Sequence, residues 1–315
     1  MSETPSISVV VPVYGCITCL TKLHANLEET FAKNSLTWEL IFVDDRDPNE
    51  HWEKICDLAQ KDPRVRGIRL SRNHGQHLAI WAGLDEAIGE WTVVMDCDLQ
   101  DDPKIIPDLL ETATNKKLHA VVVDRGVWSE SILRRFGSRI FFRLVHLLSG
   151  VELKNIGNFG LYSRKMIDSL LMFNEQEVFL PMMVALTGLK KSVYRVNRSK
   201  RADGESSYNF TKLLRLAIAI IIRFSDRPLK ISVFIGLSMS LLSVGVSILL
   251  VLVWLAGNIE VPGWTSSLLS MWFLSGLILA TLGLQGFYLG RIFEEVKKRP
   301  RILIEEKTSP SAPTK

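Results

Sequence analysis

Two long segments without a charged side chain, residues 231–255 and 264–290, constrain the fold of this chain most strongly. A helix needs about 20 mostly apolar residues to cross the hydrocarbon core of a bilayer, and each segment exceeds that length. The alternative is a pair of buried helices in a soluble core, but such helices rarely run this far without a polar stripe. We therefore predict a transmembrane hairpin at 229–291.

Basic residues flank this hairpin on both outer sides and are absent from the link between its two spans. Arg223, Arg227 and Lys230 precede the first span, and Arg291 and Lys297 follow the second. Because Lys and Arg favour the cytoplasmic side of a membrane, both ends of the chain are expected in the cytoplasm. We predict an integral protein of the inner or plasma membrane, without a secretory signal peptide at its start.

The first part of the chain alternates between β-branched runs and helical patterns. Strands are expected at residues 7–13, 38–44, 65–70, 91–96 and 119–124. Helices are expected between them at residues 19–33, 52–61, 77–87 and 103–115. This alternation predicts an α/β fold in which a Rossmann-like, mostly parallel sheet is covered by helices on both faces.

The composition divides the chain into four expected segments. Residues 1–205 form the α/β domain, 206–228 an amphipathic helix in the membrane interface, and 229–291 the hairpin. Residues 292–315 form a basic tail, and its Pro, Ser, Thr and Lys content from Ile304 onward predicts disorder.

The net charge argues against a nucleic-acid-binding protein, and the cysteine pattern argues against a zinc-binding protein. The net charge of +4 is small for 315 residues, which argues against a nucleic-acid binder. Cys16-x-x-Cys19 has the spacing of a metal or redox pair, but no second CxxC or His pair completes a zinc site and no thioredoxin-like pattern surrounds it, so we expect reduced, unpaired thiols. They are Cys16, Cys19, Cys56 and Cys97.

Carboxylates gather where the expected strands end. Asp44 and Asp45 end the second strand, Asp96 and Asp98 the fourth, and Asp124 the fifth. Ligands of parallel sheets bind outside the carboxyl ends of the strands, so we expect these side chains in one cleft. Like charges repel at such a site, and a bound positive group would offset them.

The segment from Asp96 to Asp98 has the spacing of a site for a hard cation. Mg²⁺ and Mn²⁺ bind carboxylate and amide oxygens, commonly together with substrate phosphates. We therefore expect Asp96, Asp98 and Gln100 to bind Mg²⁺ or Mn²⁺ shared with a diphosphate. Asp101 and Asp102 directly precede a helix, so their expected role is to cap it.

Two histidines follow the third strand. The order Arg-Asn-His-Gly75 fits a loop that faces phosphate or nucleotide. Ordinary surface or capping roles remain the default expectation for His74 and His77.

The motifs resemble, in their order, family 2 glycosyltransferases with a GT-A fold. They are Val-Pro-Val-Tyr14, Phe-Val-Asp-Asp45, Leu-Ser-Arg-Asn73, Asp-Cys-Asp-Leu-Gln-Asp101 and Arg198-x-x-Arg201-x-x-Gly204-x-Ser206-x-Tyr208. The segment Phe-Ser-Asp-Arg-Pro-Leu229 and the hairpin resemble the polyprenyl-phosphate glycosyltransferase branch, which includes dolichol-phosphate mannose synthase-like enzymes. The resemblance covers nearly the whole chain.

The resemblance implies a role for each of these residues. The nucleotide-sugar would be bound by Pro12, Tyr14, Asp44, Asp45, Arg72 and Asp96. The transfer itself would involve Asp98, Asn158, Arg198 and Arg201. The two arginines would bind phosphate, which suits a side chain that pairs with it through two hydrogen bonds, and Ser206 and Tyr208 would add hydroxyl donors for the lipid phosphate. A solvated basic loop is the alternative for the arginines.

The chain departs from the family pattern at three places. Where relatives commonly carry Thr-Gly-Asp-Phe, with the Asp proposed as a general base, this chain has Asn158, which cannot accept a proton. A lipid phosphate is already largely dianionic at pH 7, by analogy with phosphorylated side chains, and needs no base. Asn158 would then orient sugar or phosphate. Tyr-Gly-Cys16 replaces Tyr-Asn-Glu and Asp-Arg-Asp47 replaces Asp-Gly-Ser, which leaves the exact nucleotide and sugar contacts open.

The combined prediction is an inverting transfer of one sugar from a nucleotide-sugar, preferably UDP-linked, to polyprenyl (undecaprenyl) phosphate at the cytoplasmic membrane face. The expected partners are this donor, this acceptor and the bilayer, and weak packing between the two spans is compatible with a homo-oligomer. Two alternatives stay open: a glycosyltransferase that extends a lipid-linked saccharide, and a catalytically silent membrane scaffold. The joint presence of the acidic and basic motifs favours an enzyme.

Overall fold

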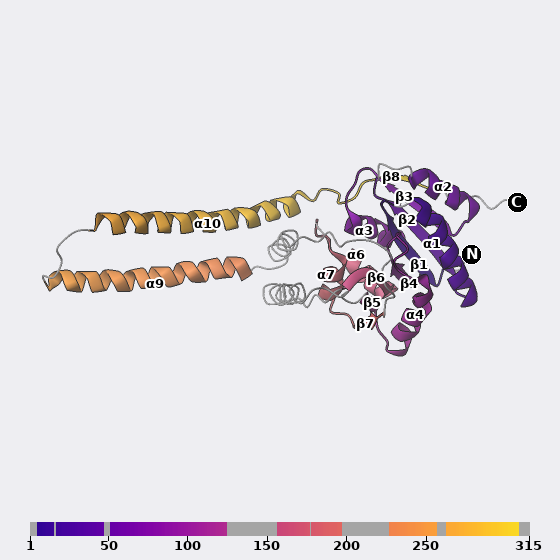
Figure 1. Ribbon diagram of the computed structural model, residues 1–315, viewed down its shortest axis with the longest axis horizontal. Helices are drawn as coiled ribbons and strands as arrows, with labels where there is room; N and C mark the ends of the chain where they lie inside the picture. Colours follow the sequence, from indigo (N-terminus) through magenta and orange to yellow (C-terminus); the bar gives the residue numbers. More distant parts are fainter. Residues whose placement is uncertain are drawn as a thin grey trace. The chain divides into compact units, whose positions relative to one another are not determined.

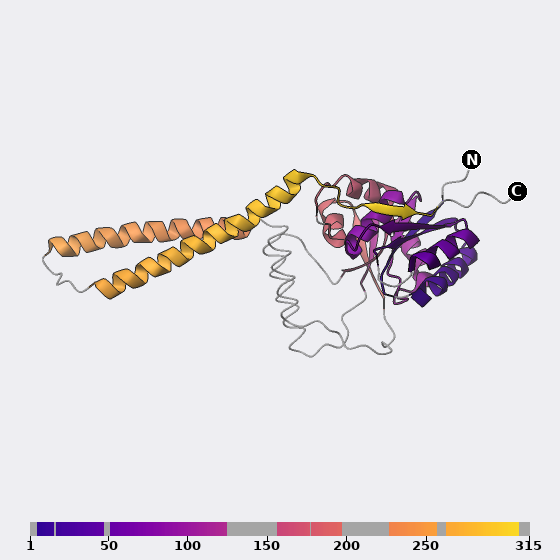
Figure 2. The ribbon, with the colours of Figure 1, turned by 90° about the horizontal axis from the view of Figure 1, so that it is seen from above.

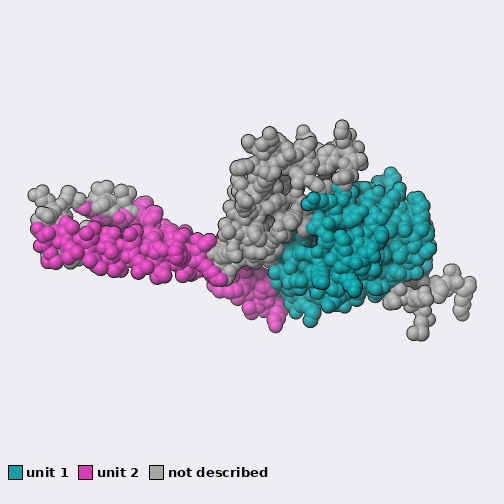
Figure 3. Space-filling view, turned by 90° about the horizontal axis from the view of Figure 1, so that it is seen from below, with its two compact units in different colours: residues 1–131, 153–204, 299–315 teal, residues 132–152, 205–298 magenta. Residues whose placement is uncertain are grey.

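The computed structural model describes residues 5–15, 17–46, 51–124, 156–176, 178–196, 227–256 and 263–308 (Figure 1). The chain divides into two compact units (Figure 3). Unit 1 contains residues 1–131, 153–204 and 299–315, and unit 2 contains residues 132–152 and 205–298. The expected interface helix lies outside the described residues as far as residue 226.

The described part of unit 1 is built on one eight-stranded sheet with the order β7-β5-β6-β4-β1-β2-β3-β8 (Figure 1). The strands are β1 (Ile7–Val13), β2 (Trp38–Asp44), β3 (Val65–Leu70), β4 (Trp91–Val94), β5 (Ala120–Asp124), β6 (Ile156–Ser163), β7 (Lys191–Arg195) and β8 (Ile304–Lys307). β1 pairs in parallel with β2 and β4, β2 with β3, and β5 with β7. β6 is antiparallel to both its neighbours, and β8 is antiparallel to β3. The predicted strands and the mostly parallel sheet are confirmed.

Helices cover both faces of this sheet. They are α1 (Ile17–Lys33), α2 (His51–Lys61), α3 (Gln76–Glu86), the short 3-10 helix η1 (Pro103–Ile105), α4 (Ile106–Asn115), α6 (Arg164–Leu171) and α7 (Leu180–Leu186). Side chains of α1, α2 and α4 form one buried cluster with Val9 and Val11 of β1. The intervening residue, Val10, faces α3 on the other side of the sheet. β1 is therefore buried on both faces, as a central parallel strand requires.

Gly83 allows α3 to lie close to the sheet. A Cβ at this position would overlap the side chain of Val10 and would lie 3.1 Å from Val43. Only a residue without a side chain fits there, because backbone and packed β-branched side chains cannot give way. The close approach positions the start of α3 near the carboxyl ends of β1 and β2.

The C-terminal tail is not disordered where it follows Ile304. Ile304–Lys307 form β8, and the hydroxyl of Thr308 accepts the N–H of Gly67 at 2.8 Å. The prediction of disorder is therefore wrong for these residues. The thiol prediction also needs a correction, since Cys56 and Cys97 are free but Cys19 is disulfide-bonded.

Unit 2 contains the two long apolar helices, α9 (Arg227–Leu255) and α10 (Trp264–Lys297), which run antiparallel to each other (Figures 1 and 2). Both contain a window that is long and apolar enough to cross a membrane, Leu229–Val246 and Ser270–Lys297. Neither window is buried. Phe234 and Trp272, for example, expose 71% and 74% of their surface. Exposed apolar surface of this extent is typical of helices that contact lipid rather than water.

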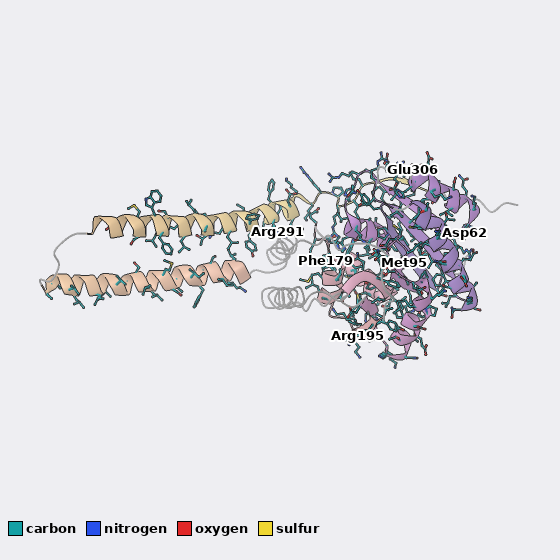
Figure 4. All side chains as sticks on the ribbon, in the orientation of Figure 1. Asp62, Met95, Phe179, Arg195, Arg291 and Glu306 are labelled. Atoms are coloured by element: carbon teal, nitrogen blue, oxygen red, sulfur yellow. The ribbon has the colours of Figure 1, made fainter. Side chains whose placement is uncertain are left out.

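A charged cluster joins α1 to the beginning of β3. The carboxylate of Asp62, which is labelled in Figure 4, accepts a hydrogen bond from Arg64 at 2.8 Å and pairs with His24 at 2.8 Å. The guanidinium of Arg64 also lies over the ring of Trp38. Burial alone would raise the pKa of Asp62, but the hydrogen bonds outweigh it and lower the pKa to about 2.

We expect Asp62→Asn to lower the free energy of unfolding by about 2 kcal/mol at pH 7, because the folded protein holds the pKa of this carboxyl well below its value of about 3.9 in the unfolded chain. This contribution is present above about pH 4 and disappears as the pH falls towards 2. Thermal unfolding of the full chain in detergent between pH 3 and 7 measures the difference. Glu29→Gln, which removes only the exposed pair with Lys33, is the matched control. An equal difference between parent and Asp62→Asn at pH 3 and pH 7 would contradict this account.

Candidate active site

A cavity of about 430 Å³ opens where β1, β2 and β4 end. Its lining comes from four consecutive strand-to-helix connections of the parallel part of the sheet. The lining residues are Pro12, Val13, Tyr14, Asp45, Asn73, Gly75, Gln76, Asp96, Cys97 and Asp98. The expected cleft at the carboxyl ends of the strands is thus present, and it contains three of the predicted carboxylates, Asp45, Asp96 and Asp98.

Asp45 joins two of these connections. Its carboxylate accepts the backbone N–H of His74 at 2.7 Å and of Gly75 at 2.8 Å, although the residue is only 3% exposed. Burial raises the pKa of Asp45, and the two amides oppose that rise because they stabilise the charged form. Asp45 therefore fixes the loop between β3 and α3 against the end of β2.

The loop before α3 adds residues that the sequence only partly indicated. Asn73 and Gly75 line the cavity, and Gly75 has a φ of 92° that favours glycine. Burial and the charge of Arg72 lower the pKa of His74. The ring of His77 instead packs against Phe179, with 4.8 Å between ring centroids (Figure 4 labels Phe179).

Asp96 is positioned by Gln76, the first residue of α3. The Gln76 side-chain amide donates to Oδ1 of Asp96 at 2.6 Å. The buried carboxylate of Asp101 accepts the backbone N–H of Asp96 at 3.3 Å. Asp101 thus holds the loop after β4, and the N-cap of η1 is Asp102. Met95, which precedes Asp96 and is labelled in Figure 4, anchors this loop in the core.

Asp98 presents an exposed carboxylate to the cavity. Its Oδ1 accepts the backbone N–H of Gln100 at 3.0 Å, and the turn between them places Leu99 at a φ of 61°. Asp96 and Asp98, two residues apart in the same connection, both line the cavity. Asp102 caps η1 by accepting the N–H of Lys104, as predicted.

Several predicted site residues lie elsewhere. Asp44 is buried beside the cavity, where it accepts the N–H of Arg46 at 3.1 Å and pairs with Arg69 at 3.4 Å. Arg72, Gln100 and Asp124 are not among the lining residues, nor is Asn158, which is half-buried in β6. Arg198, Arg201, Ser206 and Tyr208 lie outside the described residues.

Three lining residues had no predicted role, namely Val13, Gln76 and Cys97. Gln76 is the first residue of α3, at the edge of the sheet where the parallel strands end. Because ligands bind at that edge, its position after a predicted strand and loop could have indicated a site residue. Cys97 is buried, and burial raises the pKa of its thiol. Its thiol lies 3.8 Å from the carbonyl oxygen of Tyr14, so it packs the connections after β1 and β4 together.

The chain is similar to known proteins over nearly all of its length. An uncharacterized glycosyltransferase of Synechocystis sp. is 30% identical over 96% of this chain and 96% of its own. The SfII prophage-derived bactoprenol glucosyl transferase of Shigella flexneri is 31% identical over 95% of this chain and 97% of its own. Among solved structures, the mannosyltransferase PcManGT of Pyrobaculum calidifontis in complex with GDP-Man and Mn²⁺ has a TM-score of 0.44 at 14% identity, covering 95% of this chain and 89% of that one.

The family model for glycosyl transferase family 2 matches residues 8–171, which include every lining residue of the cavity. The matched segment is more than half of the 315 residues. The protein is therefore a glycosyltransferase and belongs to glycosyl transferase family 2.

Proposed function

We propose that the protein transfers one sugar from a nucleotide-sugar to a polyprenyl phosphate at the cytoplasmic face of a membrane. The observation that carries the proposal is the cavity in which Tyr14, Asp45, Asp96 and Asp98 come together from three strand ends. A relative named as a bactoprenol glucosyl transferase, similar over nearly the full length of both chains, supports the lipid phosphate as acceptor. The exposed apolar helices α9 and α10 support a membrane location for that acceptor.

The proposed donor is bound at the ends of β1 and β2. The ring of Tyr14 is 60% exposed at the cavity and is available to pack against a nucleoside base. Asp45 is held by two backbone amides and would give the ribose a fixed hydrogen-bond acceptor. We propose a UDP-linked donor, with GDP-linked donors as the tested alternative.

The proposed reaction is a single displacement with inversion. An oxygen of the lipid phosphate forms a bond to the anomeric carbon of the sugar. The bond between that carbon and the nucleoside diphosphate breaks, and the diphosphate leaves with the electron pair. Because the attacking phosphate is already largely dianionic at pH 7, no general base is needed, in agreement with Asn158 at the place where relatives commonly carry Asp.

Family 2 glycosyltransferases commonly use a divalent metal ion, and we propose that Asp96 and Asp98 hold Mg²⁺ or Mn²⁺ in this protein. The described residues include no group of three or more His, Cys, Asp or Glu side chains that could hold an ion by themselves. Two carboxylates suit Mg²⁺, which usually takes its other ligands from phosphates and water. When bound, the ion neutralises charge on the leaving diphosphate.

The acceptor side of the proposal depends on residues outside the described part of the chain. Arg198 and Arg201, with Ser206 and Tyr208, are proposed to bind the lipid phosphate. Arg is suited to this task because it stays charged and pairs with phosphate through two hydrogen bonds. The cytoplasmic orientation and self-association of the hairpin stay predictions from the sequence.

Binding of a nucleoside diphosphate with Mn²⁺ is expected to stabilise the folded protein. A ligand at about 100 times its Kd adds about 2.7 kcal/mol, which corresponds to a rise of roughly 5–10 °C in the unfolding midpoint of a domain of this size. Thermal unfolding of the full chain in detergent, with UDP or GDP and with Mn²⁺ or EDTA, measures this shift. A rise that is the same with EDTA would contradict the metal site.

Asp98→Ala is expected to reduce sugar transfer on the order of a hundredfold, the usual effect of removing one group that stabilises charge in the transition state. The assay follows radiolabelled sugar from a panel of UDP- and GDP-sugars into undecaprenyl phosphate extracted with organic solvent. Asp102→Ala is the matched control, because this carboxylate is also exposed in the same loop but caps η1 and does not line the cavity. Equal activity of the two variants would contradict the assignment of Asp98. Absence of transfer by the parent across the panel would contradict the proposed reaction.

Gln76→Leu is expected to raise the donor KM about fivefold to tenfold, because it removes one of the hydrogen bonds that orient the charged carboxylate of Asp96. The value of kcat should fall less than in Asp98→Ala. Steady-state kinetics with the sugar donor that the panel assay identifies separate the change in KM from the change in kcat. An unchanged donor KM would show that Gln76 does not position Asp96 for binding.

A further inference from the structure

We propose that residues 299–308, the C-terminal segment, form a positioning element of the donor site. This segment directly follows α10 and contains β8. All lining residues of the cavity lie before residue 99, so nothing in their sequence positions indicates a role for the far end of the chain. The inference rests on the proposed function, since it concerns the nucleotide side of the same cavity.

The backbone of the C-terminal segment is paired with β3 up to the edge where the cavity opens. β8 is antiparallel to β3, with Ile304 opposite Leu70, so β8 begins at the carboxyl end of β3. One residue further, the N–H of Ser71 donates to the carbonyl oxygen of Leu303 at 2.9 Å. The segment therefore holds the start of the loop that carries Asn73 and Gly75 into the cavity.

An ion pair connects the same segment to the end of β2. Glu305 Oε2 lies 2.7 Å from Nη1 of Arg46, the residue directly after Asp45. Arg46 has a φ of 58°, a conformation that a residue with a side chain adopts only when its surroundings hold it there. Glu305 is one of the groups that hold it. The connection after β2 and the connection after β3 are thus both attached to the C-terminal segment, and Asp45 joins them to each other.

The beginning of the C-terminal segment is anchored to the helices behind the cavity. The guanidinium of Arg301 donates to the carbonyl oxygen of Phe173 at 2.5 Å and lies over the ring of Trp81 in α3. The side chain of Gln176 donates to the carbonyl oxygen of Arg299 at 3.0 Å. Since α3 begins with Gln76, which orients Asp96, the segment supports a second wall of the donor site as well.

The C-terminal segment connects α10, a candidate membrane helix, to the loops of the proposed donor site through the continuous chain. α10 ends at Lys297, and a single residue separates it from Arg299. The chain thus continues from the second candidate span directly into the segment that pairs with β3 and with the start of the loop before α3. The simpler alternative is that β8 only covers the exposed edge of β3, a common task of an edge strand.

The test compares Glu305→Gln with Lys307→Gln in the full chain purified in detergent. Each variant removes one half-exposed ion pair of β8, with side chains 42% and 47% exposed. Glu305 pairs with Arg46 at the cavity end, whereas Lys307 pairs with Glu86 at the opposite end. Glu305→Gln is expected to raise the Kd of the nucleoside diphosphate and the donor KM about threefold to fivefold, as for loss of one such pair, with kcat unchanged. Lys307→Gln should leave all three unchanged.

Two further measurements separate positioning from stability. Reversal of the pair, Arg46→Glu with Glu305→Arg, is expected to restore the parent Kd. Hydrogen exchange of the amides of His74 and Gly75, which donate to Asp45, should be faster in Glu305→Gln and unchanged in Lys307→Gln. This exchange can be measured without a ligand. If the parent protein binds no nucleotide while exchange is still faster in Glu305→Gln than in Lys307→Gln, the proposed function is overturned and the role of the C-terminal segment in positioning the loop is supported. Nucleotide binding with equal Kd and equal exchange in the two variants would overturn the inference.

Discussion

The site depends on one buried interaction, the pair of hydrogen bonds from the amides of His74 and Gly75 to the carboxylate of Asp45. A buried carboxylate is costly unless hydrogen-bond donors compensate for the lost water, and two backbone amides provide that compensation here. The bonds connect the end of β2 with the loop that leads from β3 to α3. Because that loop ends at Gln76, the same interaction determines where Asp96 is held. Hydrogen bonds from this one loop thus position two of the carboxylates that line the cavity, Asp45 and Asp96.

The membrane imposes the second constraint. Two helices with exposed apolar faces follow the α/β domain in the sequence, yet the chain does not end with them. After α10 it re-enters the sheet as β8, and Glu86 of α3 pairs with Lys307 and Arg66, while Arg66 also reaches the buried Glu39. The catalytic domain is therefore completed only after the hairpin has been made. A glycosyltransferase that works on a lipid would gain from this order, because the two candidate membrane spans and the proposed donor site belong to one continuous chain.

Much of the fold was predictable because its strands are local patterns. The β-branched runs of β1 to β5 are separated by amphipathic helices, and this alternation defines a parallel sheet without knowledge of contacts. β6 was not predicted, since Ile156–Ser163 includes Gly157 and Gly160 and lacks a β-branched run. β8 was not predicted because Ile-Glu-Glu-Lys307 is short and polar, and its partner β3 lies more than 200 residues earlier. Pairing over such a separation leaves no local signal.

The sequence by itself determined the parallel core, the two apolar spans and the acidic strand ends, because each is a property of consecutive residues. Only the tertiary structure decided which carboxylates share a cavity. Asp45 lines it while Asp44 turns towards Arg69, since successive side chains of a strand point to opposite sides. Asp98 joins Asp96 there from the turn that follows β4, in which its carboxylate accepts the N–H of Gln100. The partnerships of Gln76 with Asp96 and of Glu305 with Arg46 also come from the fold alone, because they link segments that meet only when the sheet has formed.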